Sequence, residues 1–466
     1  MNSMTVRWRR IAAIAALAMG VLSAGPVETT AAEPGLRAGV ATVDITPDKP
    51  IWLAGYAARR KPSTGVALKL YCKALAIDDG DGGRIVLVTA DILGYTRAVV
   101  EPVAERARRE LGLRRDQIAF SASHTHAGPV IREQLFDMYA LEGANLQAVL
   151  EYNDRLGEET FRAIRAALAD LKPARLAYGR GKAGFAMNRR GFSARGVSIA
   201  WNPDGPVDHD VPVLRVSDED DNVRAVLFGY ACHCTTTGGS FYEVCSDYAG
   251  YAQKFVEDVY PGVTAMFMTG CGGDANPHPR GTLALARRHG LELAGAVTGT
   301  LTNGVKPIRG SVRTRLVHVD APLDKPPSRT EFERRAKEDR NIHRRRHARR
   351  QLAILDEKGK LPATYSYPIQ AVQIGDELTM ILLGGEVVVD YSHRLKRELG
   401  PEQTWVTAYT NDVFAYIPSM RVLLEGGYEA DSSMIYYGLP GRWHPDIENL
   451  VVNTAKKLAA AVRSGE

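Results

Sequence analysis

Short apolar segments typical of β-strands alternate with longer segments of helical spacing along most of the chain, and this alternation constrains the fold most strongly. Beginning at Gly39, GVATVDITP, LKLYCKALAIDD and RIVLVTADILG predict three strands, with a GDGG turn between the last two. Spacing and composition predict helices over 98–114, about 146–171 and about 446–463. The alternation predicts an α/β fold with mixed β-sheets flanked by helices.

Length and composition favour one large domain. The chain has 466 residues, of which 45% are hydrophobic and 24% charged. This ordinary globular composition excludes disorder over the whole chain, collagen and coiled-coil rods. Since no Ser/Pro/Gly-rich linker separates two halves and no internal repeat is evident, we expect a single domain over 36–466.

Residues 1–32 have the pattern of a secretory signal peptide. Arg7, Arg9 and Arg10 precede an apolar run at 11–24, and small residues follow. The run is shorter than the roughly 18–20 residues that a membrane-spanning helix needs, which favours cleavage over an uncleaved anchor. We therefore expect an exported protein, periplasmic or secreted.

The charge distribution argues against nucleic acid as a partner. The formal net charge is +5, which is too small for a dedicated nucleic-acid binder. The most charged stretch contains RTEFERRAKEDR and HRRRHARRQ within an excursion at about 326–360. Acidic residues interrupt the arginines, which favours a solvated helical segment over a patch for a polyanion or a membrane surface. Peripheral membrane contact is left open.

The motif SHTHAGP follows the apolar strand segment IAFSA and contains His124 and His126. Two histidines at this spacing lie on one face if the strand continues. Neutral imidazole is a good zinc ligand, although a pair of hydrogen-bonded surface histidines would have the same pattern.

His233 ends another apolar strand, between Cys232 and Cys234, with Cys245 and Cys271 further along. A thiolate zinc site is one interpretation, but the spacing matches no paired Cys-x-x-Cys signature. An oxidising compartment would also tend to oxidise such thiols. One disulfide among these four cysteines, or plain buried thiols, is the favoured expectation.

Two glycine-rich turns also follow apolar strands. GCGGDANP over 270–277 would either let the backbone approach a ligand closely or form a tight structural turn. In GGE, Glu386 lies between a strand and a helix. It could be a charge at the helix N-terminus or a metal ligand.

Several of these motifs occur in one order along the chain. They are GVATVDITP, SASHTHAGP, MNRR, the strand that ends in His233, GGDANP, GGEVVVD, and AYIPS followed by GGYEA. Together they resemble the catalytic region of the neutral/alkaline non-lysosomal ceramidase family, from about residue 36 to 463. The stretch between His233 and Glu386 is short for the family.

The resemblance implies a zinc amidase. It implies that Zn²⁺ is bound by His124, His233, Glu386 and Tyr416, the last in AYIPS. It further implies that Tyr428, twelve residues later, contacts the reacting carbonyl. His126 and Arg189 match the remaining polar positions of the family's active site.

This ligand set agrees with the chemistry of catalytic zinc. Two nitrogens, one carboxylate and one phenol leave a position for water, and zinc lowers the pKa of such a water to about 7. Zinc-bound hydroxide would then attack the carbonyl. Tyr428, His126 and Arg189 could stabilise the oxyanion, and His126 could protonate the leaving nitrogen.

The chain also departs from the family's pattern. Asn276 stands where the family's GDVSP-type loop has a serine, and its position makes it a fourth candidate for the catalytic site, beside His126, Arg189 and Tyr428. A serine nucleophile is not expected here. Cys232 and Cys234 beside the second histidine are unusual. The sequence stops soon after the catalytic region, so the family's C-terminal immunoglobulin-like domain is not expected, which leaves long-chain lipid specificity open.

The sequence therefore predicts an exported zinc-dependent amidase that cleaves an N-acyl, ceramide-like bond in a small-molecule or lipid-like substrate. One alternative is a hydrolase of an ester, lactone or glycan-linked substrate, which the same chemistry would serve. Another is a zinc-containing binding protein without turnover. The presence of His126, Arg189 and Tyr428 disfavours the latter, because a protein that only binds its ligand does not need side chains that stabilise an oxyanion. Acyl-chain length and oligomeric state are not determined by the sequence.

Overall fold

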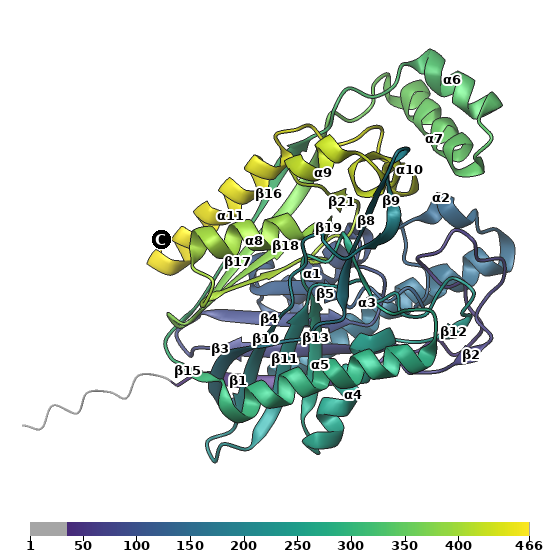
Figure 1. Ribbon diagram of the computed structural model, residues 1–466. Coiled ribbons are helices and arrows are strands. Elements are labelled where there is room, and N and C mark those ends of the chain that lie inside the picture. Colours follow the sequence, from purple (N-terminus) through teal and green to yellow (C-terminus); the bar gives the residue numbers. More distant parts are fainter. Residues whose placement is uncertain (1–34, 466) are drawn as a thin grey trace, which may run out of the picture. The chain divides into compact units, whose positions relative to one another are not determined.

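The computed structural model describes residues 35–465 and contains three large β-sheets (Figure 1). Each of these sheets contributes one face to a shared apolar core. The first sheet has the order β5-β4-β3-β1-β6, the second β13-β11-β10-β7-β15 and the third β16-β17-β18-β20. The strands of the first sheet are β1 (Arg37–Asp44), β3 (Tyr71–Asp78), β4 (Arg84–Ala90), β5 (Ile118–Ala122) and β6 (Lys172–Pro173). Those of the second are β7 (Arg175–Lys182), β10 (Asp210–Ser217), β11 (Val223–Tyr230), β13 (Thr264–Thr269) and β15 (Lys306–Ile308). Those of the third are β16 (Val312–Pro322), β17 (Thr364–Ile374), β18 (Leu378–Leu383) and β20 (Thr404–Thr407).

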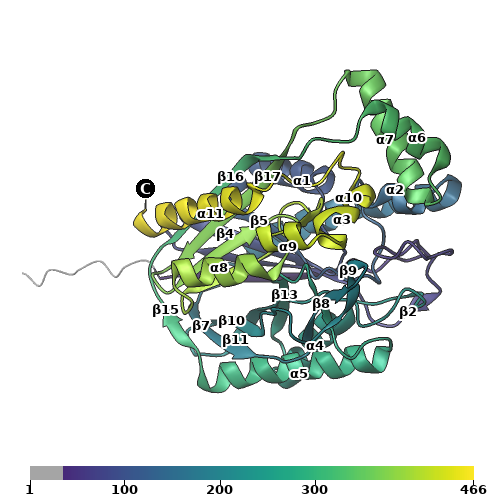
Figure 2. The same ribbon diagram turned by 45° about the horizontal axis from the view of Figure 1, so that its top comes forward.

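Helices cover the other face of each sheet (Figure 2). The covering pairs are α1 (Arg97–Leu111) with α3 (Gly143–Ala169), α4 (Asp247–Val259) with α5 (Leu283–Asn303), and α8 (Val389–Leu399) with α11 (Ile447–Ser464). Side chains alternate between the two faces of a strand. Leu75 and Ile77 therefore enter the shared core, while Ala74 and Ala76 pack under the helices. Burial on both faces explains why these strands are almost wholly apolar.

The remaining elements are short pairs, helical turns and one helical excursion. They are β2 (Gly65–Val66) with β12 (Glu243–Val244); β8 (Ala186–Ser193), β9 (Gly196–Asn202) and β14 (Ala275–Pro277) in a three-stranded sheet; β19 (Glu386–Val387) with β21 (Tyr416–Ile417); η1 (Arg115–Gln117); α2 (Phe136–Tyr139); α9 (Met420–Glu425); the π-helical turn η2 (Tyr428–Ser432); and α10 (Met434–Tyr437). The excursion consists of α6 (Arg329–Glu338) and α7 (Ile342–Lys358).

Helix α7 packs beside α10 and α2. His347 lies 2.7 Å from the carbonyl oxygen of Leu439, and Gln351 donates to the carbonyl of Gly438 at 2.9 Å. Although α7 is rich in arginine, its buried face therefore holds the segment that directly follows α10.

The three sheets meet where the strands of their parallel pairs reach their carboxyl ends. Each sheet contains one parallel pair, and the edge strands of these pairs are β5, β13 and β20. The hydroxyl of Thr269, the last residue of β13, donates to the carbonyl of Ala122 at the end of β5 at 2.7 Å. The hydroxyl of Thr407, the last residue of β20, donates to the carbonyl of Thr269 at 2.7 Å. Side chains that follow strands of different sheets are thereby brought to one place.

The predicted mixed α/β fold is confirmed, and the predicted helices correspond to α1, α3 and α11. The β8–β9 hairpin was not predicted. The signal-peptide pattern over 1–32 lies outside the described residues. Within 35–465, no helix combines the length and apolarity needed to cross a bilayer.

All five cysteines are buried and unpaired. Of the two favoured expectations, the disulfide is therefore wrong and the buried thiols are confirmed. Burial raises the pKa of the Cys72 thiol to about 11 and shifts the pKa of the other four thiols upward as well. Such groups are poor nucleophiles at neutral pH.

We predict that the native protein hardly reacts with a thiol reagent such as Ellman's reagent at pH 8. After denaturation, five thiols per chain should react, because unfolding both exposes them and restores their ordinary pKa. Stopped-flow absorbance with and without guanidinium measures both amounts. Rapid labelling of the folded protein would contradict the burial described above.

Candidate metal centre

His124 follows β5 by two residues, and its backbone and ring are both held in place. Its φ of 60° lies in the left-handed region that residues other than glycine rarely occupy, and strain of this kind is typical of functional sites. The ring Nδ1 lies 2.6 Å from the carbonyl oxygen of Leu93. A carbonyl only accepts hydrogen bonds, so Nδ1 carries the proton and Nε2 points into the site with a lone pair.

His233 is fixed in the same way from the second sheet. Its Nδ1 lies 2.8 Å from the carbonyl oxygen of Gly272. Burial, together with the charge of Arg189, lowers the pKa of His233 to about 3, so the ring is neutral at pH 7. Its single proton is on Nδ1, and Nε2 therefore presents a second lone pair to the site.

Glu386, from the third sheet, meets both histidines. Its Oε2 lies 3.1 Å from Nε2 of His124 and 3.0 Å from Nε2 of His233. With both ring protons on Nδ1, these contacts are not hydrogen bonds, and the buried Oε2 has no donor. Lone pairs that converge at this distance repel one another unless a cation lies between them. The three side chains therefore suit a metal ion.

Tyr416 completes the predicted ligand set. It pairs with Glu386 in the short β19–β21 ladder, and its hydroxyl lies 3.1 Å from Nε2 of His233. Nη2 of Arg189 donates to the same hydroxyl at 3.0 Å. The structure thus brings together all four side chains for which the sequence predicts metal binding.

His126 belongs to the same cluster of imidazoles. Its Nε2 lies 3.1 Å from Nε2 of His124, and the nitrogens of His124, His126 and His233 that could bind a metal all lie within 4.8 Å of one another. Gly55, with φ of 91°, packs against the ring, where a Cβ would lie 2.3 Å from Nδ1. Arg59 donates to the backbone carbonyl of His126 at 2.7 Å. His126 is therefore held tightly, close enough to act as a metal ligand or as an acid.

The other predicted catalytic residues surround Tyr416. The ring of Tyr428 lies 5.4 Å from that of Tyr416, centroid to centroid, and the guanidinium of Arg189 lies 5.9 Å from the Tyr428 centroid. Nη1 of Arg189 donates to Oδ1 of Asn276 at 3.3 Å. Every side chain selected from the sequence as catalytic or metal-binding thus lies in one site.

The GGDANP loop supports this site through its backbone. A Cβ on Gly273 would lie 2.6 Å from the carbonyl oxygen of Glu386. The buried carboxylate of Asp274 accepts from the backbone N–H of Val389 at 2.9 Å, and burial raises its pKa to about 7. The loop also accepts from the backbone N–H of His233. These contacts favour the structural interpretation of the turn, because it joins the segments that carry two predicted ligands.

Two tyrosines of the site were not predicted. The hydroxyl of Tyr437 in α10 donates to Oε1 of Glu386, which leaves Oε2 for the metal position. Tyr409 is buried with φ of 55°, and its ring lies 4.5 Å from that of His124. Neither lies in a motif recognised from the sequence, and no spacing pointed to either.

Comparison with known proteins identifies the family. The family profile described as neutral/alkaline non-lysosomal ceramidase, N-terminal, matches residues 36–284, just over half of the chain. The chain belongs to this family. The match includes His124, His126, Arg189, His233 and Asn276, whereas Glu386, Tyr416 and Tyr428 lie beyond it and join the site only in the structure.

Relatives and solved structures agree with this assignment. The chain is 25% identical to neutral ceramidase A of Dictyostelium discoideum over 264 residues and 26% identical to neutral ceramidase of Pseudomonas aeruginosa over 252 residues. Each match covers 52% of this chain but only 36% and 37% of the respective relative. The fold resembles the crystal structure of the Pseudomonas aeruginosa enzyme, with a TM-score of 0.70 at 20% identity over 93% of this chain and 75% of that one. A structure described as ceramidase complexed with C2 gives a TM-score of 0.72 at 20% identity, over 93% of this chain and 76% of that one.

In this ceramidase-family chain, we predict that Tyr437→Phe weakens metal binding by about 10–100-fold, the usual effect of losing a hydrogen bond to a metal-binding side chain. Competition with a chromophoric chelator measures the affinity. Tyr436→Phe is the matched control, because Tyr436 is adjacent but makes no described bond to Glu386. Equal affinities in the two variants would contradict a supporting role for Tyr437.

Proposed function

We propose that the protein is a zinc-dependent amidase that hydrolyses the N-acyl bond of a ceramide-like substrate. The observation that carries this proposal is the convergence of unprotonated Nε2 and Oε2 atoms from His124, His233 and Glu386 beside the Tyr416 hydroxyl. Membership of the ceramidase family supports the reaction type. The basic and apolar pattern of residues 1–32 supports export.

The donor set favours zinc over other common cations. Magnesium and calcium prefer shells made entirely of oxygen, whereas two imidazoles with a carboxylate and a phenol suit zinc. His124, His233, Glu386 and Tyr416 would hold the ion. When bound, zinc would activate a water molecule and polarise the substrate carbonyl.

Other side chains of the site would assist the reaction. The phenol of Tyr428, half-buried beside Tyr416, would donate to the carbonyl oxygen as negative charge develops there. His126, next to His124, would deliver a proton to the leaving nitrogen. Oδ1 of Asn276 accepts from Arg189 and from Thr235, so this side chain orients Arg189 and is not a nucleophile.

The test is hydrolysis of a panel of N-acyl amides and matched esters by purified protein, with and without a chelator. We expect amide cleavage that the chelator abolishes and added zinc restores, with about one zinc per chain by elemental analysis. His233→Ala should lose both zinc and activity. Cleavage of the esters without cleavage of the matched amides would favour the ester alternative, and zinc binding without any turnover would favour a binding protein.

We predict that Tyr428→Phe lowers kcat by about 100-fold or more, because one oxyanion donor is lost. Zinc content should stay unchanged, since the ring and all four proposed ligands remain. Steady-state kinetics and elemental analysis of the same preparation measure both quantities. A covalent acyl adduct on any residue of the 273–277 loop, detected by mass spectrometry, would instead indicate a side-chain nucleophile.

A further inference from the structure

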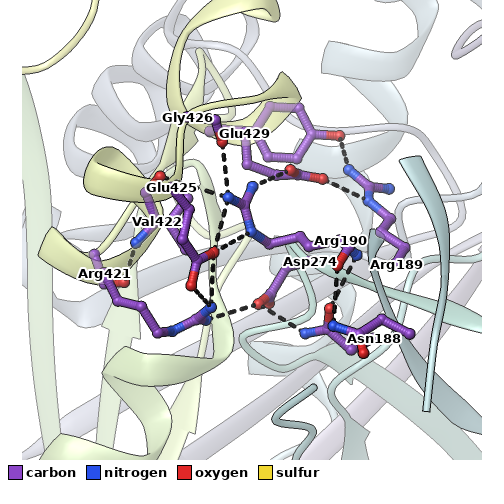
Figure 3. Close-up of polar contacts among 12 residues, drawn as sticks. Asn188, Arg189, Arg190, Asp274, Arg421, Val422, Glu425, Gly426 and Glu429 are labelled. Carbon is purple, nitrogen blue, oxygen red and sulfur yellow. Dashed lines mark hydrogen bonds and ion pairs between the residues drawn. The ribbon is translucent and has the colours of Figure 1, made fainter. Parts of the chain in front are cut away.

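A buried carboxylate joins two adjacent arginines behind the site. Glu429, in η2, is 1% exposed. Its Oε1 accepts from Nε of Arg189 at 2.8 Å, and its Oε2 accepts from Nη1 of Arg190 at 2.6 Å (Figure 3). Both arginines are buried as well. The carboxylate therefore bridges β8 to a turn that lies 240 residues away from Arg189 in sequence.

A local irregularity of the hairpin lets both arginines reach one carboxylate. Consecutive side chains of a regular strand point to opposite faces. The β8–β9 register shifts between Asn188 and Arg190, and such a bulge redirects side chains. The backbone of Arg189 is held next to this bulge, because its N–H donates to the carbonyl of Asp274 at 2.8 Å.

Apart from their bonds to Glu429, Arg190 and Arg189 contact different parts of the molecule. Beyond Glu429, Arg190 donates to Glu425 at 3.0 and 3.1 Å and to the carbonyl of Gly426 at 2.8 Å. Arg421 donates to Glu425 at 2.9 and 3.0 Å from the other side. All these contacts lie within the 421–429 segment, so Arg190 anchors the backbone that leads to Tyr428.

Arg189, in contrast, faces the site. Its remaining nitrogens donate to the Tyr416 hydroxyl at 3.0 Å and to Oδ1 of Asn276 at 3.3 Å. A guanidinium is planar and rigid. Fixing its Nε edge against Glu429 therefore determines where Nη1 and Nη2 point.

We propose that Glu429 is a positioning residue of the active site. It orients Arg189 so that Nη2 donates to Tyr416, and through the chain it holds the adjacent Tyr428 beside the same phenol. This inference rests on the proposed zinc amidase site, in which Tyr416 is a metal ligand and Tyr428 an oxyanion donor.

A matched pair of substitutions distinguishes a positioning role of Glu429 from a role in the stability of the fold alone. Glu429→Met removes the acceptor of both arginines, whereas Glu425→Met removes a carboxylate from Arg190 and leaves Arg189 untouched. We expect Glu429→Met to lower kcat by about 10–100-fold with little change in KM. Glu425→Met should retain kcat even if its melting temperature falls. Glu429→Gln should recover part of the loss, because its amide oxygen can still accept from Nε of Arg189.

The copper-substituted protein supplies a readout that does not depend on turnover. A tyrosine bound to Cu²⁺ through its phenolic oxygen gives a charge-transfer band in the visible range. We expect this band to shift or weaken in Glu429→Met and to stay unchanged in Glu425→Met. If the methionine variants do not fold, Glu429→Gln is compared with Glu425→Gln. We then expect a smaller shift of the band, in the Glu429 variant alone, because the amide offers one acceptor oxygen to two arginines.

Two results would overturn the positioning role. One is an unchanged kcat and copper band in the Glu429 variant. The other is an equal loss in the Glu429 and Glu425 variants that follows their loss of stability. If the unmodified protein cleaves no substrate of the panel, the proposed function fails, but the copper band still shows whether Glu429 positions Arg189 against Tyr416.

Discussion

The site depends on two backbone carbonyls that accept hydrogen bonds from the ring Nδ1 atoms of two of its histidines. The carbonyls of Leu93 and Gly272 accept from Nδ1 of His124 and His233, respectively. Each imidazole is thereby restricted to one tautomer and one orientation, as is usual for histidines that bind metals. Glu386 then meets two lone pairs without a proton between them. The architecture around the site can be understood as the means of holding these mutually repelling atoms together.

The three-sheet core explains how such atoms can be forced close to one another. His124, His233 and Glu386 each follow a strand of a different sheet. The shared core and the threonine bonds between Ala122, Thr269 and Thr407 fix where those strands end. Rigid elements of this kind position side chains more accurately than free loops do. The repulsion between the converging Nε2 and Oε2 atoms is therefore opposed by the packing of a large apolar core.

Residues adjacent to strand ends could be predicted from the sequence, and residues defined by long-range contacts could not. His124, His233 and Glu386 follow recognisable apolar strands, and the motif order suggested Tyr416 and Tyr428. Tyr437 reaches Glu386 across 51 residues and Glu429 reaches Arg189 across 240. No local pattern encodes such pairings, although Glu429 stands within GGYEA, directly after a predicted residue. The choice between a disulfide and buried thiols likewise depended on distances that only the fold determines.

The packing of α7 links the helical excursion to the candidate metal position. His347 and Gln351 hold the carbonyls of Leu439 and Gly438, and Tyr437 lies immediately before them with its hydroxyl on Glu386. A substitution on this helix can therefore alter the basicity and placement of Glu386 without touching any residue of the catalytic motifs. Related chains that differ only on the buried face of this excursion would then differ in how firmly they could hold a metal ion.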